Sequence, residues 1–215
     1  MKSTRATARR YGGKTAEQRS AERRGSLIDA ALQLWRDQSW TAVTMRGVCA
    51  RAGLTDRYFY ENFTDRDALL GTVWDQVRDE TFAMLLTTIH ALSERPPLEQ
   101  LRAALTAVVH HIADEPEQAQ ILFGDHTGSA VLEQRRHDVI QLATDLLITL
   151  ARPYLRPQID ENEFRTNVLL GIGGFVQVVF AWRAGLVEAE TEAIVEYLAG
   201  VAEALSPRFL RHNAL

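Results

Sequence analysis

The sequence predicts an all-α protein with about nine helices, and three observations lead to this fold class. Apolar side chains recur at steps of three and four residues along most of the chain, which gathers them on one face of each helix. No segment of useful length alternates apolar and polar residues as a half-buried strand does. Glycine and proline stand mostly where one periodic segment stops and the next begins.

Residues 1–20 lack apolar periodicity, and we expect them to form a flexible basic arm. Its cations either follow DNA phosphates or an adjacent minor groove, or they belong to a solvated tail without a partner. These cations are Lys2, Arg5, Arg9, Arg10 and Lys14. The first helix should run from about Ala21 to Ser39, because Leu27 and Trp35 then share one of its faces.

Two short helices are expected next, separated by a single turn. Thr44 is a suitable N-cap for a helix that ends at Ala52, and Gly53 follows where a left-handed backbone is needed. Thr55 then caps the second helix, over residues 56–62. These lengths and this turn predict a helix-turn-helix.

Caps and breaks divide the rest of the chain into further helices. One of these helices should open with a capping box at Thr64, which is followed three residues later by Asp67, and another should open at Asp160, which is followed three residues later by Glu163. Pro116 suits the first turn of another helix, and Gly185 suits the position after a helix end. The expected ranges are 64–92, 98–112, 116–123, 130–151, 160–184 and 191–205.

Charge is distributed unevenly along the chain. Residues 1–66 carry 13 Lys and Arg against 7 Asp and Glu, whereas residues 67–215 carry 11 against 21. Such asymmetry indicates a basic end that meets a polyanion and an acidic body that does not, although a solvated tail on a neutral domain would give the same totals. The whole chain has a net charge of −4.

Several function classes are excluded by what the sequence lacks. A single cysteine, Cys49, rules out an internal disulfide and a cysteine-rich metal site. His126 and His137 are eleven residues apart and lack metal-ligand spacing, and no catalytic constellation or phosphate loop stands out. We therefore expect no enzyme activity, cofactor or metal. The longest apolar run, residues 168–182, is shorter than the roughly 20 residues of a membrane span, so a cytoplasmic protein is expected.

The segment from Thr44 to Leu70 resembles the DNA-binding region of the TetR family of bacterial transcriptional regulators. The family pattern has an initial Thr, an Ala-Gly core, a Leu-Tyr pair in the recognition helix, a following aromatic, a Lys and a Leu-Leu pair. Here Phe59-Tyr60 stands for the Leu-Tyr pair, and Arg66 stands for the lysine. These departures leave the operator sequence open while the fold implied by the resemblance stands.

The resemblance implies a set of DNA-facing residues: Thr44, Arg46, Thr55, Arg57, Tyr58, Tyr60 and Arg66. Arg57 and Tyr58 are the candidates for reading bases, and an arginine can bind guanine O6 and N7 with two hydrogen bonds. The others should contact phosphates. Alternatively, Tyr60 packs half-buried against the fourth helix, and Asp56 caps the recognition helix or orients Arg57.

The resemblance also implies that the acidic body dimerises and binds an effector. A largely apolar small molecule would be enclosed by residues from several helices: Trp74, Phe82, Met84, His110, Phe123, His137, Phe175 and Gln177. The last two long helices would form the dimer interface, with contacts expected at Leu169, Ile172, Val176, Val179 and Phe180. Gly171, Gly173 and Gly174 indicate close helix approach at this interface, room for a ligand, or a tight crossing inside one monomer.

We expect a flexible arm over 1–20, a helix-turn-helix DNA-binding domain over 21–66, a ligand-binding and dimerisation domain over 67–206, and a C-terminal tail over 207–215. The expected function is a homodimeric repressor that a small molecule releases from a pseudo-palindromic operator in double-stranded DNA. The alternative is a DNA-binding regulator without such an effector, controlled by a protein partner or acting as an activator.

Overall fold

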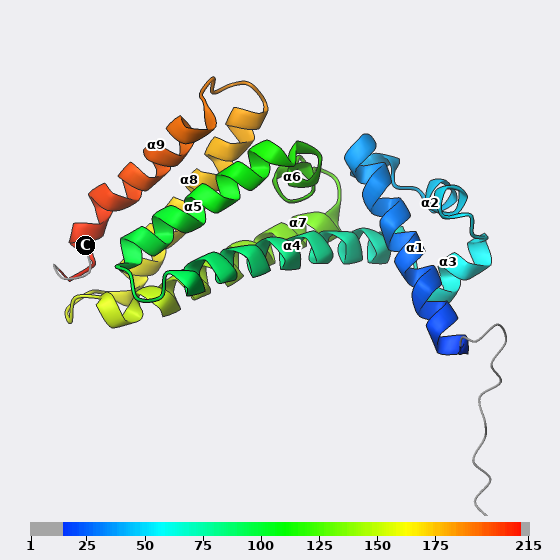
Figure 1. The fold of residues 1–215 in the computed structure, drawn as a ribbon, viewed down its shortest axis with the longest axis horizontal. Helices are drawn as coiled ribbons and strands as arrows, with labels where there is room; N and C mark the ends of the chain where they lie inside the picture. Colours follow the sequence, from blue (N-terminus) through cyan, green and yellow to red (C-terminus); the bar gives the residue numbers. More distant parts are fainter. Residues whose placement is uncertain (1–14, 212–215) are drawn as a thin grey trace, which may run out of the picture. The chain divides into compact units, whose positions relative to one another are not determined.

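The structure, a computed structural model, describes residues 15–211, and within them the chain forms nine α-helices (Figure 1). The all-α prediction is therefore confirmed, and β pairing in this part is limited to one antiparallel bridge between Leu155 and Leu210. The helices are α1 Ala16–Asp37, α2 Met45–Ala52, α3 Asp56–Asn62, α4 Arg66–Ala91, α5 Pro97–Asp114, α6 Pro116–Phe123, α7 Ala130–Ala151, α8 Glu161–Arg183 and α9 Thr191–Leu205.

The first helix starts earlier than the sequence predicts. Helix α1 begins at Ala16 because Thr15 and Gln18 form a reciprocal capping box, with Thr15 Oγ1 accepting from the Gln18 amide at 3.1 Å. The expected arm over 1–20 was therefore drawn too long. Its proposed DNA-contacting cations, from Lys2 to Lys14, lie outside the described residues.

Helix α4 also differs at its start. The predicted capping box at Thr64 is wrong, since the side chain that accepts a backbone hydrogen bond is Asp65, whose Oδ1 takes the Ala68 amide at 2.7 Å. Because α4 begins at Arg66, Asp65 occupies the capping position and Thr64 lies one residue too early.

The chain divides into an N-terminal unit that ends at Val73 and a C-terminal unit that begins at Trp74. In the N-terminal unit, α1 packs against both α2 and α3. Leu27 and Trp35 of α1 and Phe59 of α3 belong to the core of this unit, and each is at most 1% exposed. The unit extends past the predicted boundary at 66, because the first turns of α4 bury further apolar side chains: Leu69, Leu70 and Val73.

The helix-turn-helix forms as the sequence predicts. Thr44 Oγ1 accepts from the Gly47 amide at 3.1 Å and caps α2. Gly53 ends α2 with φ 65° and ψ 30°, the left-handed conformation that lets the chain turn sharply into α3. Phe59 and Phe63 then anchor α3, with ring centroids 5.8 Å apart.

A pair of glycine substitutions tests this turn. Replacing Gly53 with Ala should destabilise the protein by about 1 kcal/mol, because Ala is strained at positive φ while the space around it is empty. Gly25→Ala, in the interior of α1 and also surrounded by empty space, should stabilise it by about 0.5–1 kcal/mol. Urea unfolding followed by circular dichroism measures both, and equal shifts for the two variants would contradict the proposed role of Gly53.

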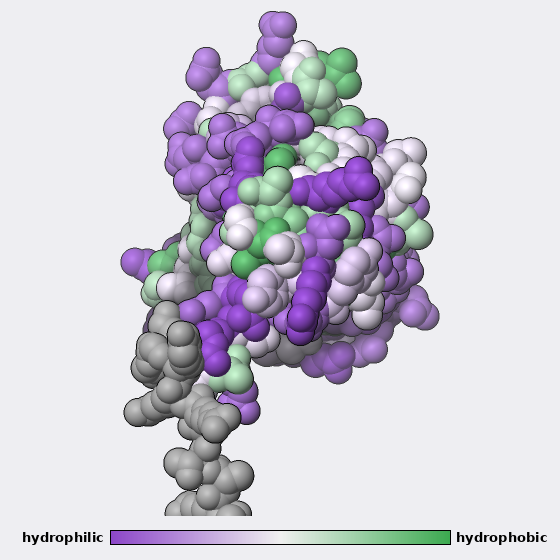
Figure 2. All heavy atoms as spheres, turned by 90° about the vertical axis from the view of Figure 1, so that its right-hand side faces the viewer, coloured by the Kyte–Doolittle hydropathy of each residue, from purple (hydrophilic) through white to green (hydrophobic). Residues whose placement is uncertain are grey.

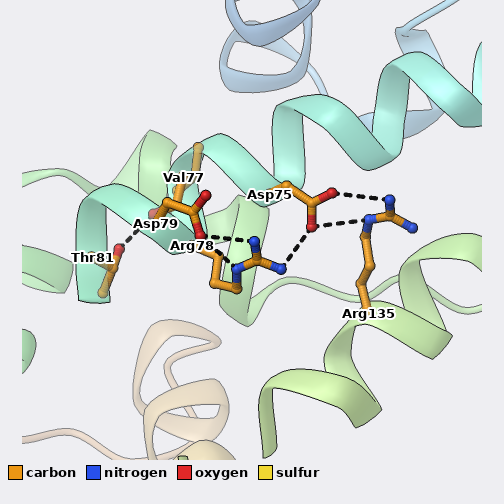
Figure 3. A network of polar contacts seen from close by, with 6 residues as sticks. All are labelled: Asp75, Val77, Arg78, Asp79, Thr81 and Arg135. Carbon is orange, nitrogen blue, oxygen red and sulfur yellow. Dashed lines mark hydrogen bonds and ion pairs between the residues drawn. The ribbon is translucent and has the colours of Figure 1, made fainter. Parts of the chain in front are cut away.

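In the C-terminal unit, α5 packs on α9 and α7 packs on α8. The core between them is formed by small and branched apolar side chains: Val108, Val109, Ile112, Ala119, Val179, Ile194 and Val195. Polar contacts add to this packing where α4 meets α7 (Figure 3). Asp75 of α4 accepts from Arg78 at 2.8 Å and from Arg135 of α7 at 3.0 Å, so one carboxylate joins two helices.

The C-terminal segment is part of this unit and does not behave as a separate tail up to residue 211. Phe209 is 2% exposed and its ring lies against Phe164, with centroids 5.4 Å apart. The Arg156 amide donates to the Phe209 carbonyl at 3.0 Å, and the Arg211 amide donates to the Tyr154 carbonyl at 2.9 Å. The predicted tail over 207–215 is thus corrected for its first part, because these residues bury apolar area and pair their backbone.

Candidate nucleic-acid interface

Helix α3 presents one polar face to solvent while its other face is buried. The Arg57 side chain is 84% exposed and Tyr60 is 61% exposed, whereas Phe59 between them is 1% exposed. The exposed position of Tyr60 argues against the alternative in which it packs half-buried, although its ring does touch the edge of Phe59 at 5.6 Å. Two of the predicted DNA-facing side chains are therefore free to meet a groove.

A group of four side chains surrounds the middle of this face. Arg57 Nε donates to Glu61 Oε1 at 2.9 Å, one helical turn further on. Arg23 reaches across from α1, with its guanidinium 4.6 Å from the centre of the Tyr58 ring and its Nη2 4.0 Å from Glu61 Oε2. Sequence reasoning missed Arg23 and Glu61, because their meeting depends on how α1 crosses α3.

The start of each short helix contributes further DNA-facing candidates. Arg46 is exposed in the first turn of α2, next to Thr44, whose hydroxyl is already engaged in capping. Thr55 stands at the N-cap position of α3 as predicted, but its side chain makes no capping hydrogen bond there, so this part of the prediction is wrong. Amide groups at a helix N-terminus favour phosphate, so these three residues remain predicted phosphate contacts.

Arg66 was predicted to contact DNA phosphates, but its guanidinium forms hydrogen bonds inside the N-terminal unit. Its Nε donates to the Val43 carbonyl at 2.5 Å, its Nη2 donates to the Trp40 carbonyl at 2.7 Å, and the guanidinium lies 5.2 Å from the Trp40 ring. Arg66 therefore ties α4 to the segment before α2, and we remove it from the set of DNA-facing residues. The lysine-like position alone did not reveal these internal acceptors.

Asp56 and Cys49 link the two short helices. Burial raises the pKa of the Cys49 thiol, and Asp56 raises it further by its charge and by a hydrogen bond. A buried thiol with a raised pKa stays protonated and is a poor nucleophile. Asp56 thus has an internal partner, which fits the alternative that it supports α3 and does not contact DNA.

Figure 2 views the molecule from the side on which Figure 1 draws α1, α2 and α3. Hydrophilic side chains dominate this face, and apolar ones form only small groups between them. Such a surface suits contact with a hydrated, charged duplex.

Neither of two hollows in the described part of the C-terminal unit gathers the predicted effector-pocket residues. An open hollow of about 260 Å³ lies among α6, α7 and α8, and Phe123 and Gln177 belong to its lining together with Arg136, Val176 and Phe180. A second hollow of about 350 Å³ lies over one face of α7 and includes His137 and Arg136. Arg136 therefore borders both.

The other predicted pocket residues line neither of these hollows: Trp74, Phe82, Met84, His110 and Phe175. Trp74 is fully buried in the protein interior. His110 faces α9, where its Nε2 lies 3.4 Å from Glu192, and its bond to the Thr106 carbonyl and this carboxylate raise its pKa. Phe175 packs edge-on against Phe123, at 6.0 Å between centroids. The spacing of apolar residues did not distinguish core from cavity wall.

His126 should make the stability of the protein depend on pH. It is 1% exposed, and burial lowers its pKa, as does the charge of Arg136, while Asp125 acts in the opposite direction. In the unfolded chain this imidazole binds a proton below about pH 6.5, whereas in the folded chain it stays neutral to lower pH. The free energy of unfolding should therefore decrease as the pH falls below about 6.5. Urea unfolding between pH 7.5 and 5.5 measures this fall, and His126→Gln should flatten it. An unchanged slope in the variant would contradict this role.

Helix α8 exposes several large apolar side chains. Leu170 is 70% exposed, and Leu169 and Phe180 are 41% and 39% exposed. Val179 is fully buried in the core described above, so its predicted place at a dimer interface is wrong: it lies on the opposite side of α8 from Leu170. Ile172 and Val176 are partly buried and border the exposed face.

The glycines of α8 lie in open space. A Cβ atom built at Gly171, Gly173 or Gly174 meets no atom within 4 Å, which excludes a tight helix crossing inside the monomer at these positions. Among the described residues, α8 is also the one helix long and apolar enough to cross a membrane by length and composition, with 17% of its apolar window buried.

Comparisons with known proteins agree with this geometry. Residues 27–73 match the sequence model of the bacterial regulatory proteins of the tetR family. A TetR-like transcriptional regulator from Rhodococcus sp. RHA1 has the same fold at 18% identity, with a TM-score of 0.63 over 85% of this chain and 94% of that one. The match ends at Val73, where the N-terminal unit of the structure also ends.

Two further solved structures resemble the chain along most of its length. SmeT, the repressor of the Stenotrophomonas maltophilia multidrug efflux pump SmeDEF, is 16% identical, with a TM-score of 0.66 over 89% of this chain and 92% of that one. NalD, the secondary repressor of the MexAB-OprM multidrug efflux pump in Pseudomonas aeruginosa, is 17% identical, with a TM-score of 0.64 over 90% and 98%. At these identities the likeness establishes the fold.

Proposed function

We propose that the chain, whose residues 27–73 match the sequence model of the bacterial regulatory proteins of the tetR family, is a homodimeric repressor that a small molecule releases from its operator. The observation that carries the DNA-binding part is the exposed face of α3, with Arg57 84% exposed and set against a buried Phe59. SmeT and NalD, which share the fold, are repressors by their own descriptions. A DNA-binding protein of this kind works in the cytoplasm.

The homodimer is supported by the exposed apolar surface of α8 and α9. Leu170 on α8 and Tyr197 on α9 are 70% and 64% exposed in the single chain. Exposed apolar patches often mark contact surfaces between subunits. In a dimer with two-fold symmetry, the same patch on both subunits forms the interface. Gly173 leaves room for a partner helix to approach closely. Such a dimer would present two copies of α3 to successive major grooves, about 34 Å apart.

An effector is supported by the open hollow among α6, α7 and α8. Its lining combines apolar side chains, among them Phe123 and Val176, with the cation Arg136. We infer a largely apolar ligand that carries a polar or anionic group. Binding would shift the protein between DNA-competent and released states only by its difference in affinity for the two. Helix α4 contributes residues to both units and is the element through which such a shift would pass.

A regulator without a small-molecule effector is the second candidate. It is favoured by the observation that Trp74, Phe82, Met84, His110 and Phe175 line neither hollow. A titration of apolar carboxylic acids, in which DNA affinity is followed, separates the two candidates. An affinity that never changes would favour the second.

Fluorescence anisotropy of the full chain on the DNA upstream of its own gene, across a salt series, tests the proposal. Saturable binding that survives competitor DNA is the expected result, because base contacts add an affinity that salt does not screen away. Weak binding that disappears with salt on this DNA and on sites selected from random duplexes would contradict it.

A further inference from the structure

Glu61 is an acidic residue on the face of α3 that we assign to DNA. A carboxylate in that place is repelled by phosphates and lowers the affinity for any duplex, so its presence calls for a specific reason. An exposed ion pair one turn apart on a helix contributes little to stability, and the 4.0 Å separation between Glu61 Oε2 and Arg23 Nη2 is too long for a hydrogen bond between α1 and α3, so the stability of the fold does not supply that reason. The contacts of Glu61 indicate another purpose.

Those contacts fix the carboxylate from two helices. Glu61 Oε1 accepts from Arg57 Nε at 2.9 Å, and its Oε2 lies 4.0 Å from Arg23 Nη2 of α1. Arg23 is itself held, because its side chain is 25% exposed and its guanidinium lies over the Tyr58 ring at 4.6 Å. Through this carboxylate, the exposed Arg57 side chain is connected to Arg23 on α1, which restricts its motion.

The contact with Glu61 also decides which edge of Arg57 is presented. Because Nε is engaged, the two Nη groups at the end of the guanidinium remain for a partner, and the side chain is 84% exposed. Two parallel donors at this end match the O6 and N7 acceptors of guanine in the major groove. A guanidinium already oriented loses less freedom on binding than a mobile one.

We propose that Glu61, held by Arg23, is a positioning residue that presents Arg57 to a guanine in each half-site of the operator. The inference rests on the proposed DNA-binding function. It adds the base that Arg57 contacts, a guanine, and the residue that makes this contact selective. Glu61 lowers the affinity for all DNA by its charge and raises the discrimination at one base pair by its geometry. Selectivity is thereby gained at the expense of general binding.

The test begins with sites selected from random duplexes by the full-length protein. Each base pair of the selected half-site is then replaced in turn, and affinities are measured for the wild type, Glu61→Gln and Arg57→Ala. The wild type should lose about 10- to 100-fold in affinity when the contacted guanine is replaced. Glu61→Gln should reduce this ratio to within a few-fold, while it raises the affinity for non-specific DNA.

Asp37→Asn is the matched control. Asp37 pairs with Arg51 of α2 at 2.6 Å, lies in the same unit, and its replacement changes the net charge by the same amount. This variant should keep the full guanine discrimination. Arg57→Ala and the Arg57→Ala, Glu61→Gln double variant should show the same loss at the same base pair, since Glu61 acts through Arg57.

Three results would overturn the proposal. Glu61→Gln could keep the full ratio at every position, which would leave the ion pair without a role in recognition. The ratio could instead be lost at a G·C pair other than the one that Arg57→Ala affects, which would mean that Glu61 reads a base directly by accepting from the N4 amino group of that pair's cytosine. If the wild type selects no sequence at all, the proposed DNA-binding function fails first, and the positioning role fails with it.

Discussion

Replacing both Arg57 and Tyr60 with Ala is expected to reduce specific DNA affinity by about 100-fold or more. Each lost base or phosphate contact costs about 1–3 kcal/mol, and two such contacts give this factor. The fold should survive, because the two side chains are 84% and 61% exposed and lie outside the core. Anisotropy on the selected operator measures the loss, while circular dichroism and sedimentation check helicity and mass.

Another exposed arginine, in the C-terminal unit, provides the control for this variant. The Arg95 side chain is 64% exposed and lies in the C-terminal unit, before α5. Arg95→Ala removes the same charge and should leave operator affinity within about two-fold, because charges outside the contact region are screened over about 8–10 Å. If the double variant kept its affinity, the assignment of α3 as the recognition helix would be wrong.

The sequence was most informative where local chemistry decides the structure. Helices α6 and α7 start and end at their predicted residues, since Pro116 opens the first and a loop of Gly, Asp and Ser precedes the second. Helix α1 was predicted to begin too late because its first turns are exposed and carry no apolar periodicity. The spacing of Thr15 and Gln18, three residues apart as in a capping box, could have indicated the start of α1, but it is not part of the apolar pattern.

Tertiary contacts explain what the sequence could not supply. Arg66 has the residue type and place of a phosphate contact, yet its donors are used by the Trp40 and Val43 carbonyls 26 and 23 residues away. Arg23 becomes part of the DNA-facing group only because α1 crosses α3 at Tyr58. Pairs so distant in sequence leave no periodic trace, so neither role could be inferred in advance.

Helix α8 presents the same difficulty in another form, because it is apolar on nearly every side. Periodicity then cannot say which side faces the core and which faces a partner. The structure separates them: Val179 is fully buried, whereas Leu170 is 70% exposed. This separation turns a general expectation about dimerisation into a pair of substitutions with opposite outcomes.

Leu170→Asp is expected to dissociate the dimer without unfolding the chain. The two-fold symmetry of a homodimer places the new carboxylate in the interface twice, where each copy loses water and gains no partner. Helicity should persist, since the side chain is exposed within one subunit. Sedimentation velocity should give a mass near the 24.2 kDa of a single chain, and operator affinity should fall because one half-site contact is lost.

Val179→Asp is the matched contrast, on the same helix and with the same new charge. Val179 is 0% exposed in the core formed by α5, α8 and α9, so an unpaired carboxylate there should prevent stable folding and abolish helical circular dichroism. If α8 tolerated no added charge on any side, both variants would unfold. If the interface lies on the exposed side of α8, Leu170→Asp is a folded monomer. A folded dimer for Leu170→Asp, with an unchanged dissociation constant, would place the subunit contact elsewhere.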